Sequence, residues 1–553
     1  MPGPRRADCR FHAVMLGSRR QDVDNFATGA AMTDAAEMPN IVLFMADQLT
    51  AQVLSAWGGG VCRTPNLDRL AARGAVFDRA LCAYPLCAPS RAALMTGRLP
   101  SRIGAWDNGA EFPAALPTFA HYLRARGYYT CLSGKMHFVG PDQFHGFEER
   151  LTTEIYPADF CWTPDPAGDA GDGGAERFGA GVSSVETIAD AGPVARSMQI
   201  DYDEDVIHHE VREIYHRARS PDRRPFLLAV SLSQPHDPFV TTPRWWDLYD
   251  GAAIDPPRVP PVPPEARDPH SRALHAHYGQ DRFPIGPEAT LRARRAYYAM
   301  VSHVDAMLGQ LMAALEACAM AERTVVIFTS DHGEMLGERG MWFKKTLFEP
   351  AIHVPLVIAG PGIAPGRIAT PVSLIDLMPT ILDLAGIGAA GLAAPVEGQS
   401  LGPFLARGIG AHGPVLAEHL DGGTAAARVM LREGALKLVL SRAYPPMLHD
   451  LAADPQEQED LAADPDWAGT LARMTAKAET LWDLDALDQA RRASQRARRL
   501  VDAALRSGRR RSWDHLPGPL AQNTGYVRCA DRFPEVERRA YLPVSPPASA
   551  PGR

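Results

Sequence analysis

The chain has 553 residues, of which 46% are hydrophobic and 22% are charged, values typical of a globular protein. Its formal net charge of -8 argues against nucleic acid as a partner, so an anionic substrate would require a locally positive pocket. No stretch approaches the ~20 apolar residues that span a bilayer, and residues 1–38 lack the apolar core of a signal peptide. We therefore expect no membrane association.

The first segment, residues 1–38, is predicted to be a disordered or mis-started N-terminal extension, and we assign it no function. The cysteines of the chain lie at irregular intervals, which favours reduced thiols and a cytoplasmic protein over a disulfide framework. They are Cys9, Cys62, Cys82, Cys87, Cys131, Cys161, Cys318 and Cys529.

Four short apolar runs with strand-like composition each end in polar residues. They are Ile41–Met45, Gly127–Leu132, Phe226–Leu232 and Thr324–Thr329. Continuous apolar runs bounded by turn residues are typical of strands that are buried on both faces of a parallel sheet. Helical stretches such as Thr118–Arg126 and Ala293–Ala317 alternate with them. The pattern predicts an α/β fold with a mostly parallel sheet flanked by helices.

Acidic, basic and imidazole side chains follow these four predicted strands. They are Asp47, Lys135 with His137, His236, and Asp331 with His332. A single Asp after a strand is usually a turn former or a helix cap. Since ligands of open α/β sheets bind at the carboxyl ends of the strands, we expect the four sets to converge on one crevice.

The C-terminal part has a different pattern. Strand-like pieces at Val415–Glu418, Arg428–Leu431 and Lys437–Leu440 predict a small antiparallel α+β subdomain, and residues 466–510 have helical composition. We divide the chain into a main α/β domain at 39–405, a C-terminal subdomain with a helix at 411–510, and an extended tail at 511–553.

The segment Cys87-Ala88-Pro89-Ser90-Arg91 is followed by Met95-Thr96-Gly97-Arg98. Pro89 suits the first turn of a helix, and helix-favouring residues then continue to a glycine. Cys87 would therefore lie at a helix N-terminus, which favours anions, with Arg91 one turn away. The alternative is that Cys87 is a small buried apolar residue, as most free cysteines are.

These residues resemble the signature of the sulfatase family within the alkaline phosphatase superfamily. Further family motifs follow in order, and the resemblance extends from about residue 39 to about residue 461. It implies an alkaline-phosphatase-like fold, a catalytic domain at 39–405, and a Cys87 that a formylglycine-generating maturation enzyme oxidises to Cα-formylglycine.

The resemblance also implies one divalent metal ion, held by Asp47, Asp331, His332 and the modified Cys87, with Gln48 as a further candidate. Many sulfatases have a second Asp at the position of Gln48 and an Asn at that of His332. Choline sulfatases and phosphonate monoester hydrolases share the departures seen here. Oxygen ligands favour Ca²⁺ or Mg²⁺ and an imidazole ligand admits Mn²⁺, so the metal stays open.

The charges of the remaining residues suggest their roles. We expect Arg91, Lys135 and Lys344 to bind the sulfuryl oxygens, with Lys344 preferred to Lys345. His236, helped by Lys344, would protonate the leaving alcohol. His137 would remove the proton from the second hydroxyl of the hydrated aldehyde, which allows sulfate to leave.

A longer match over residues 121–160, together with Asp107-Asn108 and Trp162-Thr163-Pro164-Asp165, resembles choline sulfatases. It implies that Asn108 contacts the ester and that Trp162 binds the quaternary ammonium, for which an indole face is a suitable partner. Residues 165–184 contain no His where choline sulfatases have one that faces choline. Another alkyl sulfate is therefore an open alternative.

The segment Arg538-Arg539-Ala540-Tyr541 resembles a choline sulfatase tail that packs across subunits, which implies a homo-oligomer, a dimer or a tetramer. Two other functions remain open. One is hydrolysis of phosphonate monoesters or phosphodiesters, and the other is a catalytically silent binding protein in which Cys87 stays a thiol.

Overall fold

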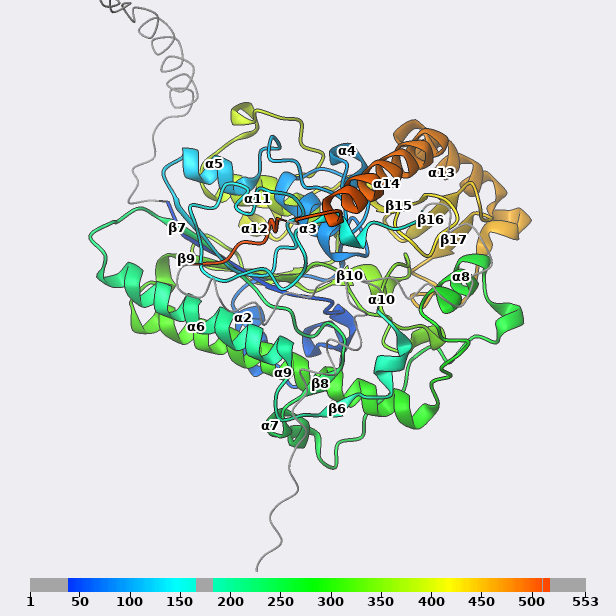
Figure 1. The fold of residues 1–553 in the computed structure, drawn as a ribbon, viewed down its shortest axis with the longest axis horizontal. Coiled ribbons are helices and arrows are strands. Elements are labelled where there is room, and N and C mark those ends of the chain that lie inside the picture. Colours follow the sequence, from blue (N-terminus) through cyan, green and yellow to red (C-terminus); the bar gives the residue numbers. More distant parts are fainter. Residues whose placement is uncertain (1–37, 166–182, 510, 518–553) are drawn as a thin grey trace, which may run out of the picture.

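The computed structural model describes residues 38–165, 183–509 and 511–517. An eight-stranded sheet forms its centre (Figure 1). In spatial order its strands are β12 (Gly366–Ile368), β2 (Ala75–Phe77), β11 (Leu356–Ala359), β9 (Thr324–Ser330), β1 (Asn40–Ala46), β7 (Phe226–Ser231), β4 (Tyr129–Gly134) and β5 (Glu149–Arg150). Only β11 pairs antiparallel with its neighbours, so the expected mostly parallel α/β sheet is confirmed.

The four predicted strands are the central strands β9, β1, β7 and β4. All seven residues of β1 are buried, and its alternate side chains enter two different cores. Val42 and Phe44 pack in one core, whereas Ile41 and Leu43 pack in the other. Both faces of the sheet are therefore covered, which explains the continuous apolar runs in the sequence.

Helices form a layer on each face of the sheet (Figure 1). One layer contains α2 (Pro65–Ala72), α6 (Met198–Arg219) and α9 (Pro287–Ala317), which pack in the same core. The other contains α3 (Cys87–Thr96), α5 (Phe119–Ala125) and α11 (Leu377–Leu384). Helix α9 begins six residues before the predicted Ala293, because Pro287 occupies its first turn after Gly286.

A second, antiparallel sheet has the order β14 (Val415–His419), β15 (Arg428–Glu433), β16 (Leu436–Ser441) and β17 (Met447–Asp450). It confirms the small antiparallel subdomain and adds β17 to the three predicted strands. Helices α13 (Ala468–Leu481) and α14 (Leu484–Arg506) follow in the region of helical composition. The domain boundaries remain predictions.

Short elements complete the described part of the chain. The helices are α4 (Pro100–Ile103), α7 (Pro243–Trp246), α8 (Pro269–His277), α10 (Glu349–Ile352) and α12 (Gly402–Arg407), and the strands are β3 (Ala80–Leu81), β6 (Gly192–Pro193), β8 (Val240–Thr241), β10 (His353–Val354) and β13 (Val372–Ser373). Among the described residues, no helix is both long enough and apolar enough to cross a membrane. Three predictions lie wholly or mostly outside these residues: the N-terminal extension, the divergent segment 165–184 and the tail with Arg538–Tyr541.

Candidate active site

Four sets of predicted site residues follow the carboxyl ends of four adjacent strands. Because β9, β1, β7 and β4 are neighbours in the sheet, their ends lie side by side. Gly134, the last residue of β4, has a φ of 105°, and a Cβ atom there would lie 1.9 Å from the carbonyl oxygen of Ser231. Only glycine therefore allows β4 to approach β7 this closely before the chain reaches Lys135.

Four of the predicted ligands form one buried cluster. Single side-chain atoms of Asp47, Cys87, Asp331 and His332 all lie within 4.8 Å of one another. The Cys87 Sγ atom is 3.2 Å from His332 Nε2 and 3.7 Å from Asp47 Oδ1. Helix α3 begins at Cys87, as expected, so the first turn of that helix faces the cluster.

Two buried cations hold the carboxylates of this cluster. Arg91 Nε donates to Asp331 Oδ2 at 2.8 Å, and Lys135 Nζ forms an ion pair with Asp47. Burial opposes the ionised form of Asp331, but Arg91, His332 and Lys135 hold the pKa of its carboxyl well below the usual value. Burial lowers the pKa of His332, which favours the neutral imidazole that a metal ligand requires.

This donor set fits a divalent cation. Two carboxylates and an imidazole are ligands suited to Ca²⁺, Mg²⁺ or Mn²⁺. They lie around the side chain of residue 87, which is 1% exposed. Burial raises the pKa of the Cys87 thiol to about 11, so the unmodified side chain is a neutral thiol and a weak nucleophile.

Gln48 lies beside the cluster and connects it, through Lys344, to His236, the predicted general acid. Its backbone N–H donates to Asp331 Oδ1 at 3.1 Å, and its side-chain oxygen accepts a hydrogen bond from Lys344 Nζ. Lys344 Nζ also contacts Nε2 of His236, so this predicted pair is in contact. Lys345 instead forms an ion pair with Asp421, with an N–O distance of 2.7 Å.

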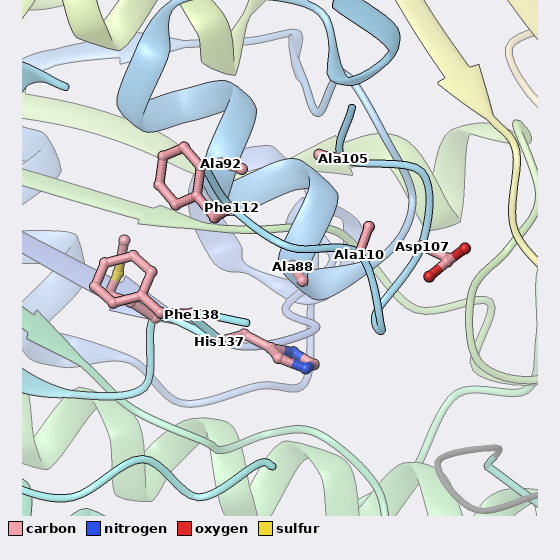
Figure 2. Close-up of a pocket in the computed structure, with 9 residues that line it drawn as sticks. Ala88, Ala92, Ala105, Asp107, Ala110, Phe112, His137 and Phe138 are labelled. Carbon is pink, nitrogen blue, oxygen red and sulfur yellow. The ribbon is translucent and has the colours of Figure 1, made fainter. Parts of the chain in front are cut away.

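His137 lies in an aromatic setting near the start of α3. Its ring stacks on Tyr156 with centroids 4.7 Å apart, and Trp162 meets it edge-on at 5.5 Å. Figure 2 shows the imidazole next to Ala88. Neither ring nitrogen of His137 has a hydrogen-bond partner among the described residues. Burial lowers the pKa of His137 well below its usual value, which keeps the ring neutral.

The predicted substrate contacts line one cavity together with the reacting groups. Asn108, Trp162, Cys87, His236 and Lys344 all contribute to its wall. Asn108 Oδ1 accepts a hydrogen bond of 3.0 Å from the backbone N–H of Ala88 in the first turn of α3. Trp162 ends a short 3₁₀ helix at Phe160–Trp162.

Sequence reasoning assigned no site role to several residues that shape this region. Glu334 Oε2 accepts a hydrogen bond from Gln48 Nε2 at 2.5 Å. Glu154 Oε2 accepts the backbone N–H groups of Met136 and His137 at 3.0 and 2.8 Å. Glu334 lies three residues after Asp331, a spacing that could have drawn attention to it, whereas the bonds of Glu154 have no signal in the sequence.

The chain is similar to several known proteins. A family model described as "Sulfatase" matches residues 39–387, and one described as "Choline sulfatase enzyme C terminal" matches residues 482–541. A choline-sulfatase of Rhizobium meliloti (strain 1021) is 43% identical over 486 residues, covering 87% of this chain and 94% of the relative. An arylsulfatase K of Xenopus laevis is 27% identical over 462 residues, covering 78% and 81%.

Among solved structures, a phosphonate monoester hydrolase from Silicibacter pomeroyi has a TM-score of 0.65 and 25% identity, covering 80% of this chain and 94% of its own. A phosphonate monoester hydrolase of Agrobacterium radiobacter has a TM-score of 0.64 and 26% identity, with coverages of 80% and 95%. Since the first family model matches more than half of the chain and the 43% identical Rhizobium relative covers 87% of it, the protein belongs to the sulfatase family and is a sulfuric ester hydrolase.

Proposed function

We propose that this enzyme hydrolyses choline sulfate to choline and sulfate. The observation that carries the proposal is an aromatic wall beside the acidic cluster. Trp162 and Tyr156 line the same cavity as Cys87, and their ring centroids are 4.9 Å apart. A trimethylammonium group cannot donate conventional hydrogen bonds, so aromatic faces are its natural partners. The identity to a choline-sulfatase and the match at 482–541 support the same substrate.

The proposed cofactors are a Cα-formylglycine at position 87 and one Ca²⁺, Mg²⁺ or Mn²⁺ ion held by Asp47, Asp331, His332 and residue 87, with Gln48 as a further ligand. When bound, they supply an oxygen nucleophile whose pKa the metal lowers. A maturation enzyme of the host would act on Cys87 before folding is complete, because the folded chain buries this residue.

The proposed basic residues of the site stabilise negative charge or transfer protons. Arg91, Lys135 and Lys344 bind the sulfuryl oxygens and offset the negative charge that develops there. His236, in contact with Lys344, donates a proton to the oxygen of the departing choline. His137 accepts the proton whose loss accompanies the release of sulfate.

We further propose a cytoplasmic homo-oligomer, either a dimer or a tetramer. Cys62, Cys82 and Cys131 are buried thiols, a use of cysteine that suits a reducing compartment. The oligomer is proposed from the resemblance of the tail at Arg538–Tyr541, which lies outside the described residues.

The test compares choline sulfate with an uncharged alkyl sulfate in the wild type and in Trp162→Ala. A cation–aromatic contact of about 0.5–2 kcal/mol corresponds to an increase of about 2–30-fold in KM for choline sulfate. KM for the uncharged ester should change little. Trp467→Ala, which removes a half-buried indole from another region, is the matched control. Equal kinetics for both esters in the wild type, together with no effect of Trp162→Ala, would contradict the proposal.

A second candidate is the hydrolysis of phosphonate monoesters or phosphodiesters, which the likeness to two phosphonate monoester hydrolases favours. Turnover of sulfate and phosphonate esters measured side by side distinguishes the two activities. Mass spectrometry of the Cys87 peptide tests the remaining alternative, since an unmodified thiol would indicate a binding protein without this chemistry.

A further inference from the structure

A buried arginine of the C-terminal helix α14 contacts the sequence neighbours of two residues that line the substrate cavity. Arg498 is 7% exposed, and its two terminal nitrogens donate to the two carboxylate oxygens of Asp107, each at 2.7 Å. One of them also donates to Thr163 Oγ1 at 3.0 Å. A bidentate pair of this kind fixes both distance and orientation.

The two partners of Arg498 are sequence neighbours of the two proposed substrate contacts. Asp107 immediately precedes Asn108, and Thr163 immediately follows Trp162. The two loops also touch, because a Cβ atom on Gly109 would lie 2.5 Å from the backbone nitrogen of Thr163. Arg498 thus joins, through one side chain, the two loops that present the amide and the indole to the cavity.

Asp107 is held in a structural role by its surroundings. Besides Arg498, it accepts the backbone N–H of Gly109 at 3.0 Å and Nε2 of Gln495, also on α14, at 3.3 Å. Asn108 is in turn tied to α3 through the N–H of Ala88. The chain of contacts therefore runs from α14 through Asp107 and Asn108 to the helix that starts at Cys87.

We propose that Arg498 is a positioning residue for substrate recognition, which sets Asn108 and Trp162 at the separation that choline sulfate requires. This rests on the proposed function in taking these two residues as substrate contacts. Arg498 bonds the residue before Asn108 and the residue after Trp162, so its effect should fall on binding more than on the chemical step. Arg498 lies in the segment 482–541 that matches the C-terminal family model, so the proposal gives this segment a role in substrate recognition.

The experiment measures KM and kcat for choline sulfate in Arg498→Lys and Arg498→Met. A lysine keeps the charge but cannot bond both oxygens of Asp107 and Thr163 together. In both variants we expect KM to rise by about tenfold or more, because the affinity for choline sulfate falls. We expect kcat to stay within about threefold of the wild-type value. The Kd of choline sulfate, measured by calorimetry in a Cys87→Ala background, should rise in parallel.

Arg491→Lys is the matched control. Arg491 is a buried arginine of the same helix, but it pairs with Asp488 and donates to the carbonyl oxygen of Leu420. Its replacement should leave KM unchanged. An equal rise in KM in both variants, or an unchanged KM in a folded Arg498→Lys, would overturn the proposal.

A double variant tests the route of the effect. Because Arg498 is proposed to act through Asp107, Arg498→Lys combined with Asp107→Asn should raise KM no further than the worse of the two single changes. Additive increases would contradict this route. If the wild type prefers another ester, the proposed function fails, and the same comparison with that ester still tests Arg498.

Discussion

Lys344 and Lys345 are adjacent in the chain but have different partners. Lys344 Nζ contacts His236 and Gln48, whereas Lys345 Nζ lies 3.0 Å from His277 Nε2 and pairs with Asp421. Lys345 has a φ of 67°, in the left-handed region. This conformation is energetically unfavourable for a residue other than glycine, and backbone strain of this kind is often found at functional sites. Nothing in the composition around the two lysines distinguishes them, so the choice of Lys344 came from the family resemblance.

Replacing Lys344 with alanine tests its role directly. The change removes the cation beside His236, the proposed acid, so we expect kcat for the sulfate ester to fall by about 10²–10³-fold. Steady-state kinetics measure this loss, and Lys477→Ala, which removes a half-exposed lysine of α13 that pairs with Glu433, is the control. A kcat within about threefold of the wild type would exclude Lys344 from the chemical step.

At the scale of elements, the strands that carry the site could be predicted because each is a continuous buried run. The order of these strands in the sheet could not, since β1 and β9 pair although 283 residues separate Gln48 from Asp331. The start of α3 at Cys87 follows from Pro89 and the glycine stop at Gly97. The bonds from Glu154 to the segment after β4 depend on tertiary packing and have no periodic signal.

The N-terminus of helix α2 is capped by a side chain from another helix, α9. Its N-cap residue, Thr64, makes no side-chain cap. Instead, Asp305 of α9 accepts the backbone N–H of Asn66 at 3.2 Å and that of Leu67 at 2.7 Å. The buried carboxylate thus satisfies two of the donors that a helix start leaves without intrahelical partners.

Asp305→Ala should therefore destabilise the protein through the loss of this cap. Two backbone N–H groups, of which that of Leu67 is buried, would lose their acceptor, which lowers the free energy of unfolding by about 1–3 kcal/mol. The midpoint of urea unfolding measures the change. Glu316→Ala removes an exposed carboxylate of the same helix and should alter stability by less than about 0.5 kcal/mol. Equal effects of the two substitutions would refute the capping role.

At the scale of the whole molecule, the C-terminal region is part of the environment of the site. Helix α14 contacts the 3₁₀ helix that ends at Trp162, although more than 300 residues separate them in the chain. The segment after α14 continues this contact, since Trp513 meets Phe160 edge-on at 5.3 Å. The sequence of α14 predicts a helix from its composition, but an arginine-rich helix is usually solvated, so the burial of Arg498 could not be foreseen.

Buried histidines distributed over the molecule link its stability to pH. Burial lowers the pKa of His303 to about 4, and the same cause lowers that of His275 to about 4. In the unfolded chain, both pKa values return to about 6.5. Between pH 6.5 and 4 the unfolded chain therefore binds protons that the folded protein does not. The stability that neutral histidines allow is present above pH 6.5 and is lost as the pH falls toward 4.

His303→Gln tests this linkage at one position. The His303 ring stacks on Trp245 with centroids 5.2 Å apart, and its side chain is almost fully buried. Glutamine does not titrate, so the decrease in unfolding free energy between about pH 7 and about pH 5 should be smaller than in the wild type by about 2 kcal/mol. The informative quantity is the slope of the unfolding free energy with pH. Loss of the stacking contact lowers stability equally at both pH values and so does not change this slope. His208→Gln, at an exposed position, should leave that slope unchanged. A His303→Gln slope equal to that of the wild type would mean that the ring is protonated in the folded protein or that it gains solvent access before unfolding.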